Sequence, residues 1–184
     1  NITVGVATKT NALLDQLVYK ELPALAAAMR KEDPTSVPLT FASLKGFSHY
    51  LCLWKLEHLV EDGAQMVNVH NRPVSQAPSM AALLSFSEQS DFEDMDTLKI
   101  DFQTTPRYSF TTASHDCLKH KCPYYNGKCF VFGARARAAA SHVVVTNHSL
   151  FFCDISLDHA LLPPAVYWVV DEAHGAENEA RRAL

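Results

Sequence analysis

The chain has 184 residues, 48% hydrophobic and 20% charged, which is enough to bury the core of one ordinary domain or of a domain with a small insert. A formal net charge of −4 does not by itself indicate nucleic-acid binding, and no apolar run approaches the roughly 18 residues of a membrane span. The chain begins at Asn1 with neither a signal peptide nor an initial Met, so we expect an excised part of a longer protein.

The first 46 residues show a strand, a helix and a strand in succession. The run 2–8 is rich in β-branched residues, and leucines at near-helical spacing follow over 9–31. A further apolar run at 37–46 predicts a second strand. This order is typical of a βαβ unit in a parallel sheet.

The middle of the chain is expected to be mostly helical. An amphipathic helix is predicted at 48–60, and a weaker helix near 76–87. An acidic stretch at 87–101 carries six carboxylates and one lysine, and a loop is expected around Pro106.

The last third of the chain returns to alternating helices and strands. We expect helices at 130–141 and 148–156, and strands at 142–147 and 165–174. Continuous apolar runs in both strands are typical of parallel sheets. The economical architecture is an α/β domain formed by 1–46 and 131–184, interrupted by an insert at roughly 47–130.

Three cysteines crowd one short segment with the spacing C-x4-C-x6-C: Cys117, Cys122 and Cys129. The total of five cysteines is odd, which argues against a disulfide framework and fits a reducing, cytoplasmic compartment. Clustered thiols there predict metal binding, and spacing alone leaves both zinc and an iron–sulfur cluster open. His115 and His120 flank the cluster and are expected to face solvent or DNA, whereas Cys153 is expected to be a small buried side chain.

The cysteine segment is also basic. Residues 117–137 carry five cations and no carboxylate. Because the formal net charge of the whole chain is −4, the remaining residues have a net charge of −9. This contrast predicts a local surface for anions, with a solvated charged helix face as the alternative. The aromatic residues among the cations predict either stacking on nucleic-acid bases or packing around the metal: Tyr124, Tyr125 and Phe130.

The strand at 165–170 ends in the tetrapeptide Asp171-Glu172-Ala173-His174. Ligands of open α/β sheets bind beyond the carboxyl ends of the strands. A carboxylate there can hold Mg²⁺ beside nucleotide phosphates, and a second carboxylate can deprotonate an attacking water. The alternative is a strand followed by an ordinary polar helix cap.

Four stretches together resemble the DinG/XPD group of superfamily 2 helicases. "VVDEAH" at 169–174 resembles motif II, and "VVVTNHSLFF" at 143–152 resembles the segment before it. "VGVATKTNALLDQL" at 4–17 is similar to motif Ia, and "LKGFSHYLCLWKLE" at 44–57 is similar to a signature that carries the first iron–sulfur ligand. Phe47 departs from the arginine usual in that signature, which puts one cationic contact in doubt.

The resemblance implies a fold, cofactors and site residues. It implies part of a RecA-like parallel-sheet domain interrupted by a mostly helical insert, with Cys52 as the fourth ligand of a structural [4Fe–4S] cluster. It implies ATP and Mg²⁺ at Asp171, Glu172 and His174, and single-stranded or forked DNA as the partner of a monomeric enzyme. With the charge pattern it implies these DNA contacts: Thr8, Thr10, Lys45, Lys119, Lys121, Tyr124, Lys128 and Arg135.

The chain lacks the phosphate-binding motif G-x-x-x-x-G-K-[ST] that such an ATPase needs. The resemblance implies that this motif lies upstream in a 5′→3′ helicase of DNA repair or replication, so we expect no ATPase activity from the chain alone. The alternative hypotheses are a metal-binding DNA- or protein-interaction module without ATPase activity, and a zinc-stabilised scaffold.

Overall fold

The computed structural model describes residues 3–89 and 91–183 and divides the chain into two compact units. The first unit is Asn1–Lys45 with Ala134–Leu184, and the second is Gly46–Gly133, against a predicted insert at 47–130. Ile2, which belonged to the predicted strand 2–8, lies outside the described residues. Among the described residues, no helix has both the length and the apolar character that a membrane crossing requires.

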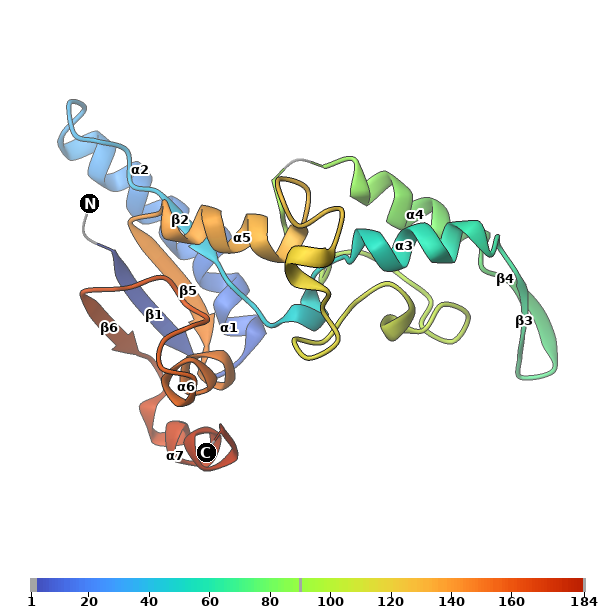
Figure 1. The fold of residues 1–184 in the computed structure, drawn as a ribbon. Helices are drawn as coiled ribbons and strands as arrows, with labels where there is room; N and C mark the ends of the chain where they lie inside the picture. Colours follow the sequence, from blue (N-terminus) through green and yellow to red (C-terminus); the bar gives the residue numbers. More distant parts are fainter. Residues whose placement is uncertain (1–2, 90, 184) are drawn as a thin grey trace. The chain divides into compact units, whose positions relative to one another are not determined.

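The first unit is built on a parallel sheet of four strands, in the order β2-β5-β1-β6 (Figure 1). The register pairs Val4 with Val143 on one side and with Tyr167 on the other. The predicted α/β fold with a parallel sheet is therefore confirmed. The strands are shorter than the apolar runs that predicted them: β1 Val4–Thr8, β2 Phe41–Ser43, β5 Val143–Asn147 and β6 Tyr167–Val170.

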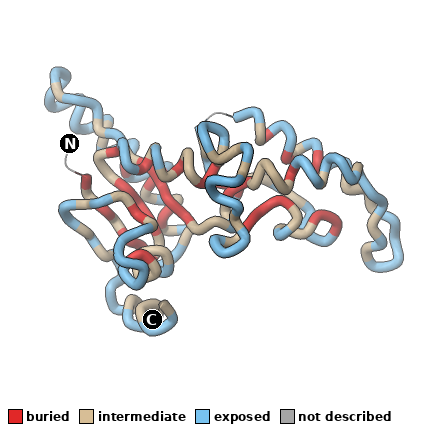
Figure 2. Tube along the Cα trace, in the orientation of Figure 1, coloured by how far each residue is buried: buried red, intermediate tan, exposed pale blue. Residues whose placement is uncertain are grey.

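One long helical segment follows β1 and packs on the sheet. It comprises α1 (Asn11–Gln16), a π-helical stretch η1 (Leu17–Glu21) and α2 (Leu22–Glu32). Its inward side chains form a buried core with β5: Leu14, Val18 and Leu22 against Val145. Figure 2 shows the matching buried stretches along β1 and β5.

Two further helices of this unit follow their predictions: α5 (Phe130–Ala139, which begins in the second unit) and α6 (His148–Ser156). The 3₁₀ turn η5 (Ala173–Gly175) and helix α7 (Ala176–Ala183) were not predicted, and η5 begins where the predicted strand 165–174 was expected to end. Gly5 in β1 lies under the Trp168 ring of β6, and a Cβ atom there would come within 2.4 Å of that ring. Residue 5 must therefore be glycine for the Trp168 ring to lie against the backbone of β1.

The second unit is less helical than expected. Its helices are α3 (Leu53–Glu61) and α4 (Ala77–Ser87), with 3₁₀ turns η2 (Phe47–His49), η3 (Arg107–Ser109) and η4 (Lys119–Lys121). An antiparallel hairpin of β3 (Met66–Val69) and β4 (Arg72–Ser75), which was not predicted, joins α3 to α4 (Figure 1). Loops make up most of 88–129. The predicted helix at 48–60 begins only at Leu53, so Cys52 is its N-cap.

Candidate functional site

The four parallel strands of the first unit end at one edge of the sheet. Thr8, Ser43, Asn147 and Val170 are their last residues. The carboxyl edge of such a sheet is where ligands of α/β proteins bind, because loops there are free to carry polar groups.

Backbone contacts fix Asp171 directly after β6. Its amide donates to the Ala7 carbonyl at 2.9 Å, which extends the sheet ladder by one residue. Its carbonyl accepts a hydrogen bond of 2.7 Å from Nε2 of His148, a fully buried side chain at the start of α6. A carbonyl can only accept, so Nε2 of His148 carries the proton. His148 holds the turn from beneath, a role the sequence analysis missed.

The backbone of Glu172 turns the two carboxylates outward. Glu172 has φ 53° and ψ 39°, a left-handed conformation that costs a non-glycine residue about 1 kcal/mol. The bond from its amide to Oδ1 of Asp171, at 2.9 Å, helps to hold that conformation. Both acids are exposed, and Nε2 of His174 lies 3.3 Å from Oε2 of Glu172. The arrangement offers two carboxylates and an imidazole to solvent.

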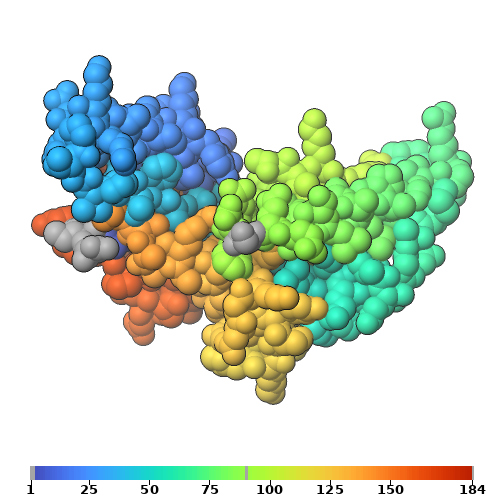
Figure 3. All heavy atoms as spheres, turned by 90° about the horizontal axis from the view of Figure 1, so that it is seen from above, coloured from blue at the N-terminus to red at the C-terminus, as the bar shows by residue number. Residues whose placement is uncertain are grey.

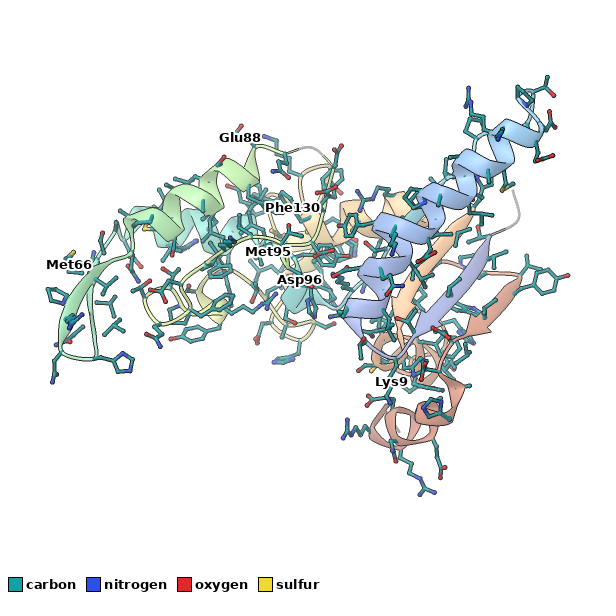
Figure 4. The ribbon with its side chains drawn as sticks, turned by 180° about the vertical axis from the view of Figure 1, so that it is seen from behind. Lys9, Met66, Glu88, Met95, Asp96 and Phe130 are labelled. Carbon is teal, nitrogen blue, oxygen red and sulfur yellow. The ribbon has the colours of Figure 1, made fainter. Side chains whose placement is uncertain are left out.

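Lys9 lies beside this turn and was also missed by the sequence analysis (Figure 4). It follows β1 directly, and a Cβ atom at Gly175 would lie 3.1 Å from its Cε. An exposed cation at the carboxyl edge complements the acids after β6. Its position immediately after a predicted strand was the signal that could have identified it.

The predicted threonines have different surroundings. Thr8 is fully buried, and its hydroxyl donates to the Thr10 carbonyl at 3.0 Å. Thr10 is exposed and caps α1, with its Oγ1 accepting from the Leu13 amide at 3.3 Å. Of the two, Thr10 is the residue that a nucleic acid can reach.

Lys45 does not occupy the surface position expected of a DNA contact. Its side chain is fully buried, and its Nζ lies 2.8 Å from Oδ1 of Asp15 on α1. The Lys45 ammonium therefore ties the segment after β2 to α1, and the prediction that it contacts phosphate is not supported.

In the second unit, all four cysteines of the predicted ligand set line one cavity of about 40 Å³. They come from the start of α3, the loop around η4 and the residue before α5: Cys52, Cys117, Cys122 and Cys129. Aromatic side chains contribute to the walls, among them Phe47, Tyr50 and Trp54. All five cysteines of the chain are free thiols, and Cys153 lies apart on α6 of the first unit.

Two of these sulfurs lie at helix N-termini. Burial raises the pKa of the Cys52 thiol and the Cys129 thiol, and the charges of neighbouring cysteines raise both further. Backbone amides at the starts of α3 and α5 act in the opposite direction and lower each pKa. Helix N-termini favour negative charge, so this geometry suits thiolate ligands once a cation is present to balance them.

The cavity can hold more than a single water molecule. Across residues 3–89 and 91–183, no three His, Cys, Asp or Glu side chains lie close enough together to hold one metal ion. A water needs roughly 10–15 Å³, so the cavity has room for a larger group. Four thiols around such a space match the donor set of a [4Fe–4S] cluster.

The basic residues divide between the two units. Lys119, Lys121 and Lys128 are exposed on the cysteine loop, whereas Arg135 is partly buried in the first unit. Of the neighbouring rings, Phe130 is buried and stacks on Phe86 with centroids 5.5 Å apart. Tyr125 packs between the rings of His120 and Phe132, at 4.5 and 4.6 Å. These contacts favour packing over base stacking for both Phe130 and Tyr125.

Comparison with curated proteins finds several similar sequences, although no family model matches the chain. The chain is 33% identical over 176 residues to the ATP-dependent DNA helicase YoaA of Escherichia coli, covering 93% of this chain and 26% of that protein. It is 32% identical over 179 residues to the ATP-dependent helicase DinG of Mycobacterium tuberculosis, with the same coverage. A 3′-5′ exonuclease DinG of Bacillus subtilis is 28% identical over 98% of this chain. The chain spans about a quarter of the length of the helicases it matches.

Proposed function

Because the chain is DinG-like in sequence and matches one segment of the YoaA and DinG helicases, we propose that it is part of an ATP-dependent DNA helicase. In this proposal the segment supplies the acidic half of the ATP site and a cluster-bearing insert. The observation that carries the proposal is the exposed pair Asp171–Glu172, held after β6 at the carboxyl edge of a parallel sheet.

The two carboxylates of this turn have different chemical tasks in the proposal. The Asp171 carboxylate holds Mg²⁺ directly or through water, and the Glu172 carboxylate orients and deprotonates the attacking water. When bound, Mg²⁺ neutralises charge that develops on the transferred phosphate. His148 keeps the peptide after Asp171 in place, so the two carboxylates need not reorganise during the reaction.

We assign a structural [4Fe–4S] cluster to Cys52, Cys117, Cys122 and Cys129. Support comes from the cavity that the four thiols share and from the two helix N-termini. Metal binding would supply folding free energy to a unit that is rich in loops. The alternative to be tested is that the four thiolates bind a zinc ion.

DNA is the proposed partner of the exposed lysines on the cysteine loop. Lys119, Lys121 and Lys128 can contact the phosphates of a single strand or a fork, and Thr10 can do so at the edge of the sheet. We further propose 5′→3′ movement and a role in repair or replication, which rest on the resemblance to this group of helicases.

The complete protein that contains this chain provides the test. Replacing Glu172 by Gln should lower DNA-stimulated ATP hydrolysis by at least about 100-fold, because the shape stays while the base is lost. Binding of a fluorescent ATP analogue should change little. Glu177→Gln on the exposed face of α7 is the matched control and should leave hydrolysis unchanged. Wild-type turnover in the Glu172→Gln enzyme would refute the assignment.

A second candidate is a metal-binding interaction module without ATPase activity. It rests on the cysteine cavity and the exposed lysines beside it, which could bind a metal and DNA without any part in ATP hydrolysis. The wild-type arm of the same experiment separates the two. A complete protein that binds DNA but does not hydrolyse ATP would support the module.

A further inference from the structure

The second unit carries a groove of about 650 Å³ between α3, the end of α4 and the loop 124–130. This volume lies within the roughly 300–1,000 Å³ typical of binding pockets. All residues that line the groove belong to the second unit, whereas the carboxyl edge of the sheet belongs to the first. Figure 3 shows the face of the molecule on which these segments come together.

Apolar side chains from α3, α4 and the start of α5 line part of the groove. One stripe of α3 faces it, with Leu53, Leu56 and Val60 at the spacing of a single helix face. Leu84 of α4 lies in the opposite wall, and Phe130 is buried beneath (Figure 4). Val60 and Leu84 are 38% and 43% exposed, which is high for large apolar side chains that line a concave surface.

The rim of the groove is acidic. Glu57 and Glu61 lie on the same face of α3, and Glu88 ends α4, against a single lysine, Lys128. These four residues sum to −2. Tyr124 lines the groove beside this rim.

We propose that this groove docks a basic amphipathic helix of a partner protein. Apolar anchors at i, i+3 or i+4 and i+7 on such a helix fit a channel between two helices, and lysines or arginines on its flanks would meet the glutamates. DNA is disfavoured as the occupant, because its phosphates would face three carboxylates. The proposal is independent of the ATP site.

The test is fluorescence anisotropy with the 184-residue chain purified without oxygen. The probe is a labelled 15-residue peptide with leucines along one helix face and lysines and arginines elsewhere. The comparison peptide has the same composition with its leucines spread around the helix. The first peptide should bind more tightly, because only it can place its anchors together in the groove.

Variants localise the binding. Glu61→Gln/Glu88→Gln should weaken the peptide by roughly threefold to tenfold, as expected for two lost surface ion pairs. Glu32→Gln/Glu93→Gln removes the same charge from exposed positions outside the groove and should have no effect. Val60→Ser/Leu84→Ser should also weaken binding, and circular dichroism would verify that each variant is folded.

Three outcomes would overturn the proposal. The two peptides could bind equally, the control pair could weaken binding as much as the groove pair, or the peptide could fail to bind the folded chain. Binding of a labelled oligothymidylate to the same variants tests DNA as the occupant. Neutralising Glu61 and Glu88 should leave its affinity unchanged or increase it. If Val60→Ser/Leu84→Ser instead weakened oligothymidylate and spared the peptide, the groove would be a DNA surface.

Discussion

The buried ion pair of the first unit predicts an asymmetric response to mutation. The Lys45 side chain is fully buried, whereas that of its partner Asp15 is 32% exposed. Asp15→Ala removes this carboxylate from a fully buried ammonium. Lys45→Met leaves a carboxylate that is partly exposed, although its Oδ1 atom is buried. The first change should therefore destabilise the unit more than the second, although both remove the same contact.

The magnitudes follow from the two exposures. Breaking a fully buried ion pair costs about 3–5 kcal/mol, and partial exposure of Asp15 reduces this to roughly 2–4 kcal/mol for Asp15→Ala. Lys45→Met keeps most of the buried volume and leaves only the partly exposed carboxylate, so it should cost roughly 1–2 kcal/mol. The double variant should be no less stable than Lys45→Met, because it removes that carboxylate as well.

Urea unfolding monitored by Trp168 fluorescence measures these differences. Trp168 lies in the first unit and Trp54 in the second, so all proteins would carry Trp54→Phe to report on the first unit alone. Equal losses of unfolding free energy for Asp15→Ala and Lys45→Met would refute the reasoning, as would a double variant as unstable as Asp15→Ala. Lys45→Met should also leave the affinity for single-stranded DNA unchanged.

Gly5→Ala should destabilise the first unit by about 1–3 kcal/mol in thermal unfolding, because the new methyl group would clash with the Trp168 ring. Gly46→Ala is its control, since no described atom lies within 4 Å of a Cβ there, and an equal loss would contradict the packing argument. Lys119→Glu/Lys121→Glu should weaken binding of single-stranded DNA and reduce the log–log salt slope by roughly 0.7 for each lost phosphate contact. Lys20→Glu/Lys31→Glu on the exposed side of the first unit should not change the slope, and no difference between the two pairs would place the DNA elsewhere.

The parts of the fold that could be predicted are those with a local hydrophobic period. The apolar runs of β1, β5 and β6 and the leucine spacing of 11–32 predicted both type and order. The sheet then brought Asp171 and Glu172 to its carboxyl edge, as parallel pairing requires.

The features that sequence reasoning missed depend on tertiary contacts or atypical turns. Burial of Lys45 depends on Asp15, thirty residues earlier, and His148 has its role only because β6 ends above it. The β3–β4 hairpin turns at His70 and Asn71, both with positive φ. A turn of this kind usually carries glycine at its second position, so the His70-Asn71 pair did not indicate a hairpin in the sequence.

The cysteine cavity links the sequence pattern to the proposed function most directly, and metal analysis tests it. The chain purified without oxygen should contain about four iron and four sulfide and absorb broadly near 400 nm. Cys52→Ser should lose most of that iron, because three thiolates leave one iron open, whereas Cys153→Ser on α6 should keep all of it. One zinc and no iron in the wild-type chain would contradict the cluster, and full iron in Cys52→Ser would contradict this choice of the fourth ligand.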